Sequence, residues 1–205
     1  QPTQTALDTY ACRHGLGYTV FESSKNDLAA SVTAFVPIGD NCEVNKVTLK
    51  NNSNAAKEVS LFSYIEFCLW NAVDDSTNFQ RNLNTGEVEL EPSVIYHKTE
   101  YRERRNHYAV YAVNEPVAGF DTDRDSFLGA YRSPSDPEVV ELGASKNTVA
   151  SGWSPIGSFQ LKATLQPGEE VSYVFVLGYI ENPVEDKWEA LNVINKKPAH
   201  AMLER

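Results

Sequence analysis

A segment rich in amides, hydroxyls and carboxylates follows an aromatic-ended strand pattern near the middle of the chain. Trp70 leads directly into Asn71-Ala-Val-Asp-Asp-Ser-Thr-Asn-Phe-Gln-Arg-Asn82. Amide and carboxylate groups match the hydroxyls of a pyranose, which both donate and accept hydrogen bonds, and an aromatic face packs on its C–H side. The pattern is therefore typical of sugar binding. We interpret Asp74 and Asp75 as solvated or capping residues, since adjacent carboxylates usually point apart and cannot flank one bond.

A second unusual segment is a charged run further along the chain. Glu100 and Glu103 lie among Arg102, Arg104 and Arg105, between Lys98 and Asn106 in the sequence. Because surface charges usually contribute little to stability, the first interpretation is a salt-linked, solvated strand or turn. Arginine is also enriched in interfaces, so a contact with another domain or subunit is the alternative.

The spacings of the common catalytic motifs are missing from the sequence. The residues around Ser154 resemble a nucleophile elbow only superficially, because Ile156 stands where that motif has glycine. The sequence has no glycine-rich phosphate loop. We therefore predict that this chain carries no catalytic residue and no cofactor.

Residues that could hold a metal ion are also spaced unlike known sites. Asp121-Thr-Asp-Arg-Asp125 begins like a calcium loop, but Ser126 and Arg132 replace its turn glycine and bidentate glutamate. The histidines lack HxxxH or HExxH spacing, which favours hydrogen-bonded structural roles over a metal site. These histidines are His14, His97, His107 and His200. No metal site is predicted.

Strand patterns must position these segments, since β-branched and aromatic residues alternate with polar ones from about residue 10 to 113. Residues 18–21 and 29–36 predict a hairpin. Residues 59–70 predict a central strand, with Leu61 and Ile65 on one face and Phe62 and Tyr64 on the other.

Turn residues divide the remainder of the chain. Residues 157–165 and 170–178 flank Gln166-Pro-Gly168, which predicts a type II turn and a second hairpin. Two long segments, 71–85 and 116–153, read as irregular.

Only the C-terminal tail suggests a helix, with Asn182 as its N-cap and Pro183 at its first position. We predict an all-β antiparallel β-sandwich over residues 1–182 and the start of a helical linker over 183–205. A barrel is the alternative.

Composition restricts the possible partners of this domain. The 205 residues carry a formal charge of -10, which repels nucleic acid. No stretch is long and apolar enough to span a membrane. Three cysteines, Cys12, Cys42 and Cys68, cannot all pair within the chain, which favours reduced thiols in a cytoplasmic protein. The start at Gln1, without initiator Met or signal sequence, suggests a fragment.

Long blocks of the sequence resemble the N-terminal region of glycoside hydrolase family ninety-four, a family that includes cellobiose phosphorylases. The blocks span nearly the whole chain and are more specific than any short motif. They are Cys12-Arg-His-Gly-Leu-Gly-Tyr18, Phe35-Val-Pro-Ile-Gly-Asp40, Leu61-Phe-Ser-Tyr-Ile-Glu-Phe-Cys-Leu-Trp70, Asp74-Asp-Ser-Thr-Asn-Phe-Gln-Arg81, Tyr96-His-Lys-Thr-Glu-Tyr-Arg-Glu-Arg-Arg105, Gly119-Phe-Asp-Thr-Asp-Arg-Asp125 and Val176-Leu-Gly-Tyr-Ile-Glu-Asn-Pro183.

The resemblance implies a large β-sandwich of the galactose-mutarotase-like or supersandwich type, with sandwich sequence upstream of Gln1. It also implies that a helical linker and an (α/α)6 barrel with the catalytic acid follow the sandwich. The expected reaction is inverting phosphorolysis of a β-linked glucose disaccharide, with inorganic phosphate as co-substrate. From cellobiose it yields α-glucose 1-phosphate and glucose.

The family also implies a homodimer in which the sandwich of one subunit completes the active site of the other. The matching residues here are Asn71, Gln80 and Arg81, which we predict to bind substrate; a merely loop-pinning Arg81 is the alternative. Other readings are the same domain of a cellodextrin, chitobiose or cellobionic acid phosphorylase, a non-catalytic sugar-binding sandwich, or a purely structural interaction domain.

Overall fold

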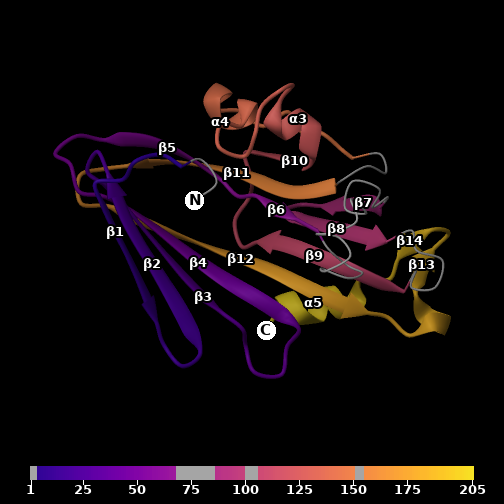
Figure 1. The fold of residues 1–205 in the computed structure, drawn as a ribbon. Helices are drawn as coiled ribbons and strands as arrows, with labels where there is room; N and C mark the ends of the chain where they lie inside the picture. Colours follow the sequence, from indigo (N-terminus) through magenta and orange to yellow (C-terminus); the bar gives the residue numbers. More distant parts are fainter. Residues whose placement is uncertain (1–3, 68–85, 100–105, 151–154) are drawn as a thin grey trace.

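An eight-stranded antiparallel sheet forms the larger layer of the domain, as Figure 1 shows for the computed structural model. The structure describes residues 4–67, 86–99, 106–150 and 155–205. The strands lie in the spatial order β1-β2-β3-β4-β12-β9-β8-β7. Their bounds are β1 Thr9–His14, β2 Tyr18–Lys25, β3 Leu28–Phe35, β4 Cys42–Asn51, β7 Gly86–Glu91, β8 Val94–Thr99, β9 His107–Val113 and β12 Glu170–Glu181.

A smaller sheet packs on one face of the larger one. It consists of β10 (Gly119–Asp123), β11 (Pro155–Leu165) and β5 (Lys57–Phe62), and the short β6 (Ile65–Glu66) also pairs with β11. Apolar residues of both sheets form the main core between them. Its buried members include Leu49, Phe67, Ile95, Tyr111, Phe159, Leu161, Leu165 and Phe175.

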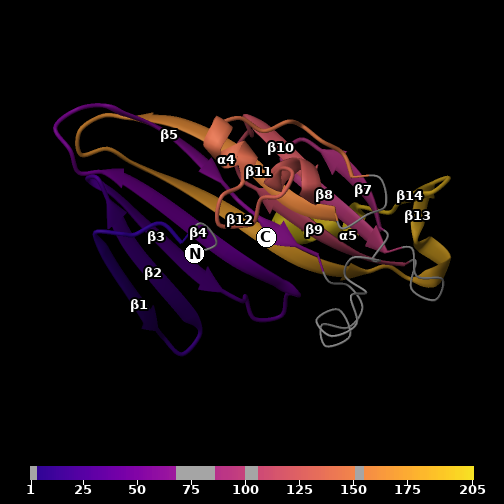
Figure 2. The same cartoon turned by 45° about the horizontal axis from the view of Figure 1, so that its top comes forward.

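Two short helices cover the outer side of the smaller sheet (Figure 2). They are α3 (Arg124–Leu128) and α4 (Glu138–Leu142). Phe127 and Val139 on these helices pack with Ile156 of β11 in a second buried cluster. Asp123 caps α3 by accepting a hydrogen bond from the Ser126 backbone, as a short polar side chain at this position commonly does.

The C-terminal residues cover the outer face of the larger sheet. They form a 3-10 turn η1 (Val184–Asp186), a hairpin of β13 (Trp188–Ala190) and β14 (Val193–Ile194), and helix α5 (Lys197–Leu203). Ile194, Ala199 and Met202 pack there against Tyr96 and Tyr108. Strand β9 is therefore covered on both faces and buried along its whole length, which explains its nearly continuous apolar sequence.

Ion pairs of two buried lysines fasten this C-terminal segment to the sheet. The Lys98 ammonium lies 2.8 Å from the Glu89 carboxylate and donates to the backbone oxygen of Asn192 at 2.6 Å. Lys196 lies 2.8 Å from Glu89 and 3.0 Å from Glu189. We call Glu89, Lys98, Lys196 and Glu189 the C-terminal clamp. The predicted salt-linked strand is thus confirmed at Lys98, but its predicted solvation is wrong there, because Lys98 is 4% exposed; residues 100–105 lie outside the described residues.

The predicted antiparallel β-sandwich is confirmed, and so is the hairpin of β2 and β3. The second predicted hairpin is wrong, because β11 and β12 belong to different sheets. The turn between them does form, with Gly168 at a φ of +79°. Asn51 anchors this turn through backbone hydrogen bonds with Gly168 and Glu169. The turn therefore leads the chain from the smaller sheet into the larger one.

The single central strand predicted over residues 59–70 is also wrong. Strand β5 pairs only with β11 among the described residues, which places it at an edge. The Ser63 hydroxyl accepts a hydrogen bond from the Phe159 backbone at 2.9 Å, taking the place of a main-chain carbonyl and interrupting the strand. The predicted faces are nevertheless right, because Leu61 and Ile65 join the main core while Phe62 and Tyr64 pack beneath α3.

The helix predicted from Pro183 begins later, at Lys197. Asn182 does not act as its N-cap. Instead, the buried Asn182 amide donates to the backbone oxygen of Asn195 at 2.9 Å and holds the two ends of the β13–β14 hairpin together. The irregular segment predicted over 116–153 contains β10, α3 and α4. No helix of the described residues is long and apolar enough to cross a membrane.

Candidate functional site

The three residues predicted to bind substrate, Asn71, Gln80 and Arg81, lie outside the described residues. Asp74, Asp75 and Cys68 also fall in this segment. The structure therefore leaves the three site residues as predictions. What it describes is the surface from which this segment departs, because Phe67 is the last described residue before it.

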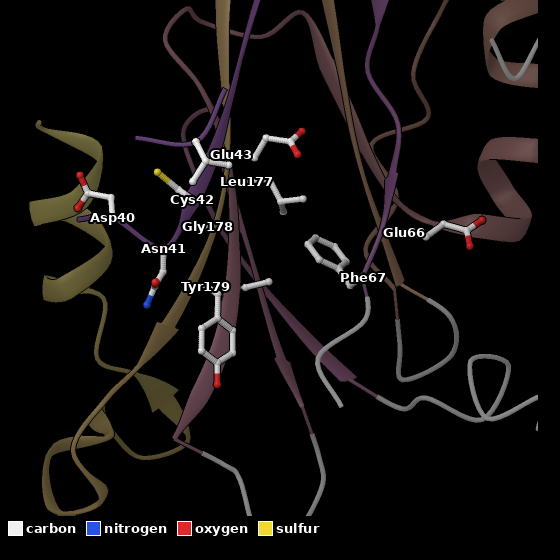
Figure 3. A pocket seen from close by; sticks show the side chains of 11 residues that line it. Asp40, Asn41, Cys42, Glu43, Glu66, Phe67, Leu177, Gly178 and Tyr179 are labelled. Atoms are coloured by element: carbon white, nitrogen blue, oxygen red, sulfur yellow. The ribbon is translucent and has the colours of Figure 1, made fainter. Parts of the chain in front are cut away.

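A pocket of about 480 Å³ lies at this end of the sandwich (Figure 3). It exists because the inner face of the larger sheet extends beyond the end of the smaller one. On β12, Tyr173 and Phe175 are buried beneath the smaller sheet, whereas Leu177 and Tyr179 on the same face are only partly covered. Phe67 closes the far side of the opening.

Apolar side chains form the inner part of the pocket. Figure 3 shows the ring of Phe67, which directly follows β6, and Leu177 of β12 turned toward one another. Glu43 of β4 lies directly opposite Leu177 in the sheet register and shares its face. Glu66, by contrast, points away from the pocket (Figure 3) and lies near the Arg124 guanidinium at 3.2 Å and the Tyr64 hydroxyl at 2.6 Å.

A chain of hydrogen-bonding groups fixes the Tyr179 phenol at the pocket. The hydroxyl of Tyr179 contacts Nδ1 of His107, and Nε2 of His107 lies 3.3 Å from the Glu181 carboxylate. A carboxylate can only accept, so Nε2 carries the hydrogen. Nδ1, on the other side of the ring, pairs with the Tyr179 phenol.

The Glu43 carboxylate is held in a similar way. The side-chain amide of Asn45, on the same face of β4, donates to Oε1 of Glu43 at 2.7 Å. Glu43 and Asn41 are both exposed to solvent at the rim of the pocket. Carboxylate and amide groups thus stand on one side of an apolar wall.

His97 lies directly behind Phe67 and is fully buried. The two rings stack with centroids 4.6 Å apart and an interplanar angle of 5°. Burial lowers the pKa of His97 to about 4, so the ring is neutral near pH 7. Neither of its ring nitrogens has a hydrogen-bond partner within the described residues. The expectation of a hydrogen-bonded structural histidine is therefore wrong at this position.

Other residues that were considered as metal ligands and predicted to be structural form hydrogen bonds within the fold. His14 lies 3.0 Å from the Thr19 hydroxyl, and His200 lies 2.8 Å from Glu91. The buried Asp121 carboxylate accepts hydrogen bonds from the backbone of Lys146 and from Thr148. Within the described ranges, no three His, Cys, Asp or Glu side chains are grouped so that they could hold a metal ion. Cys12 and Cys42 are free thiols.

The arrangement suits binding of a polyhydroxylated molecule. An apolar wall lies beside a carboxylate, an amide and a phenol, and the described part of the pocket contains no paired nucleophile and base. Sequence reasoning missed Glu43, Leu177 and Tyr179 because each reads as an ordinary strand residue. The available signal was the block from 176 to 183, in which apolar residues surround a tyrosine.

A family model matches the whole chain. The model describes the supersandwich domain of glycosyl hydrolase 94 and matches residues 1–205.

Curated relatives support the same assignment. The chain is 34% identical over 182 residues to an N,N'-diacetylchitobiose phosphorylase of Vibrio proteolyticus; the match covers 87% of this chain and 23% of that protein. It is 32% identical over 174 residues to a solabiose phosphorylase of Paenibacillus borealis, covering 84% of this chain and 22% of that protein. The chain thus spans about a quarter of the length of these relatives.

A solved structure supports the fold. The chain resembles a putative kojibiose phosphorylase from human microbiome with a TM-score of 0.51 and 10% identity, over 87% of this chain and 20% of that one. At this identity the likeness concerns the fold alone.

Proposed function

The chain belongs to the glycosyl hydrolase 94 supersandwich family, and from this premise we propose that it is one domain of an inverting glycoside phosphorylase. The observation that carries the proposal is the family match over all 205 residues, together with relatives named as phosphorylases. The sandwich positions substrate, while a following (α/α)6 domain supplies the catalytic acid. No cofactor takes part, and inorganic phosphate is the co-substrate.

Cellobiose is the substrate that the sequence blocks imply. N,N'-diacetylchitobiose is the second candidate, because a relative of 34% identity is named for that activity. Both are β-linked disaccharides. Cellodextrin and cellobionic acid remain further alternatives from the sequence resemblance.

We propose that Asn71, Gln80 and Arg81 complete the active site of the partner subunit in a cytoplasmic homodimer. Arg81 and Gln80 would hydrogen-bond substrate hydroxyls or orient neighbouring groups, which lowers the barrier by fixing the reacting geometry. The density of amides and hydroxyls in residues 71–82 supports this role.

The proposed activity is tested by incubating the complete protein with inorganic phosphate and a panel of β-linked disaccharides. We expect consumption of phosphate and formation of a sugar 1-phosphate, whose α configuration NMR would show directly. Release of monosaccharides without phosphate uptake would contradict phosphorolysis. Sugar binding with no turnover of any disaccharide would favour the non-catalytic sugar-binding sandwich.

The role of Arg81 is tested separately by Arg81→Ala. Loss of a charged hydrogen-bond donor should lower kcat/KM by about tenfold or more. Arg13→Ala is the matched control, because Arg13 forms an exposed surface pair with Glu22. Unchanged phosphorolysis by Arg81→Ala, with an intact dimer in light scattering, would count against an active-site role.

A further inference from the structure

Two kinds of surface meet in the pocket at the end of the sandwich. Phe67 and Leu177 form an apolar wall, and Glu43, Asn41 and Tyr179 place polar groups on its rim. A pyranose ring has the same division, with C–H groups on its faces and hydroxyls around its edge. Stacking of an aromatic wall on the C–H face, with polar groups at the edge, is therefore a complementary fit.

The polar groups are oriented before any ligand arrives. Asn45 fixes the Glu43 carboxylate through the 2.7 Å hydrogen bond. His107, itself held by Glu181, fixes the Tyr179 phenol. Such preorganisation reduces the entropy lost on binding. The backbone adds rigidity, because Glu43 lies on β4 and Tyr179 on the central strand β12.

The charge around the pocket selects against anions. Glu43 lines the pocket and Glu181 lies just beyond Tyr179. Asp40, by contrast, is paired with Arg205, and Glu66 points away toward Arg124. A phosphate or nucleotide would meet like charge here. A metal ion would need a cluster of ligands, which the described residues do not form. A neutral, polyhydroxylated ligand therefore fits this surface best.

A second depression, over the smaller sheet, is less suited to a sugar. A cavity of about 520 Å³ over β5 and β11 has no aromatic side chain among its lining residues. The pocket at the sandwich end has a volume of about 480 Å³, within the range of roughly 300–1,000 Å³ typical of small-molecule sites.

We propose that this pocket binds a pyranose unit of a β-linked oligosaccharide. Glu43 and Tyr179 hydrogen-bond its hydroxyls, and Phe67 with Leu177 packs against its C–H face. The choice of a β-linked sugar rests on the proposed function. Pyranose binding itself rests on the pocket and does not require that the protein cleave the sugar.

Hydrogen exchange of the complete protein tests the proposal. Cellobiose and N,N'-diacetylchitobiose are the probes, and phosphate is omitted so that no phosphorolysis occurs. We expect slower amide exchange in peptides covering residues 41–45 and 177–181 when either sugar is present. Glu43→Gln and Tyr179→Phe should each raise the sugar concentration needed for half-protection about fivefold to tenfold, because each weakens one hydrogen bond.

Matched control residues lie on β12, the strand that carries Tyr179. Tyr173→Phe removes a phenol from the buried part of the same face of β12, and Glu170→Gln removes a carboxylate at the exposed start of that strand. Neither residue lines the pocket. Protection in these two variants should equal that of the unchanged protein. Thermal unfolding of all four variants separates lost binding from lost folding.

Parallel phosphorolysis assays keep the two proposals apart. Turnover of a disaccharide without protection at residues 41–45 and 177–181 overturns the pocket proposal and leaves the proposed function intact. Protection without turnover supports the pocket and contradicts the phosphorylase. Protection that persists unchanged in both Glu43→Gln and Tyr179→Phe also overturns the proposed site.

Discussion

His97 is a buried polar residue that the sandwich tolerates only in its neutral form. It is fully buried, stacked on Phe67, and has no hydrogen-bond partner among the described residues. Charging it would place an unpaired cation beside an aromatic ring in the core. The cost of charging explains why burial lowers its pKa from 6.5 to about 4.

His97 should make the domain less stable in mild acid. In the unfolded chain the ring protonates below pH 6.5, whereas in the folded protein it stays neutral down to about pH 4. The contribution of neutral His97 to the free energy of unfolding is therefore fully present above pH 6.5 and is lost as the pH falls to 4. The difference corresponds to about 3 kcal/mol. His97→Phe keeps the stacked ring and cannot titrate, so urea unfolding should show a smaller loss between pH 7 and pH 4. An equal loss in both proteins would show that His97 does not govern this range.

Gly157 marks a close approach between the two sheets. A Cβ at this position would lie 2.9 Å from Ile65 and 2.9 Å from Tyr111. Gly157→Ala should therefore lower the free energy of unfolding by about 1–3 kcal/mol through overpacking. Gly17→Ala is the control, since a Cβ there meets no atom within 4 Å. Comparable urea midpoints for the two variants would argue against this close packing.

The C-terminal clamp joins elements that are distant in sequence. Burial alone would raise the pKa of Glu89, but hydrogen bonds from Lys196 and Lys98 outweigh it and the pKa is lowered. Burial would lower the pKa of Lys98, but the hydrogen bonds that Lys98 donates to Glu87 and Glu89 outweigh it and raise the pKa. The stability that Glu89 contributes is thus fully present when the pH is above its ordinary pKa of 4.5. It is lost as the pH falls through the lowered pKa of the folded protein. The stability that Lys98 contributes is fully present when the pH is below its ordinary pKa of 10.5. It is lost as the pH rises through the raised pKa of the folded protein.

Breaking the clamp should be costly near neutral pH. Lys98→Met leaves the partly buried Glu89 with one partner fewer, and we expect a loss of about 3 kcal/mol in the free energy of unfolding at pH 7. Arg13→Met breaks an exposed pair with Glu22 instead and should cost at most about 1 kcal/mol. Urea unfolding of both variants provides the comparison. A loss from Lys98→Met no larger than that from Arg13→Met would mean that the clamp adds little stability.

At the level of elements, sequence patterns predicted the strands better than their partners. The alternation in residues 18–36 identified both the strands and their hairpin, because those partners are adjacent in sequence. The strands β11 and β12 are also adjacent, yet they separate because Asn51 anchors the turn from a distant part of the chain. No local pattern contains that contact.

In the C-terminal tail, too, the local sequence pattern does not contain the contacts that determine the structure. Its apolar spacing suggested a helix, but Leu191 is exposed and Trp188 pairs with Ile194 across a hairpin. Asn192, at a φ of +60°, lies in the turn of this hairpin, and its backbone carbonyl accepts a hydrogen bond from the Lys98 ammonium. These tertiary contacts override the helical periodicity.

At the level of the whole molecule, the larger sheet depends on cover from both sides. A chain ending at Asn182 would expose Tyr96 and Tyr108, whose side chains are both 0% exposed to solvent in the structure. We expect that chain to aggregate or to bind the dye ANS strongly. A chain ending at Leu203 loses only Glu204 and Arg205 and the surface pair of Arg205 with Asp40, so it should remain folded. Equal solubility and far-UV circular dichroism of the two chains would contradict an essential C-terminal cover.

The candidate site could be predicted from the sequence only in part. Residues 71–82 stood out because most of their side chains are polar, and they lie outside the described residues. The pocket at the end of the sandwich was not visible in the sequence, since Glu43, Phe67 and Tyr179 come from three separate strands or strand ends. Only the pairing of β4 with β12, and the end of the smaller sheet at Phe67, bring them together.

The position of β12 has a consequence for how the protein is made. This strand pairs with β4 on one side and with β9 on the other, and it is the link between the two halves of the larger sheet. During synthesis from the N-terminus, β4 and β9 emerge well before residues 170–181. Each then presents an unpaired edge to neighbouring nascent chains. A pause in translation shortly before residue 170 would lengthen this exposure, whereas rapid delivery of β12 would close both edges in one step.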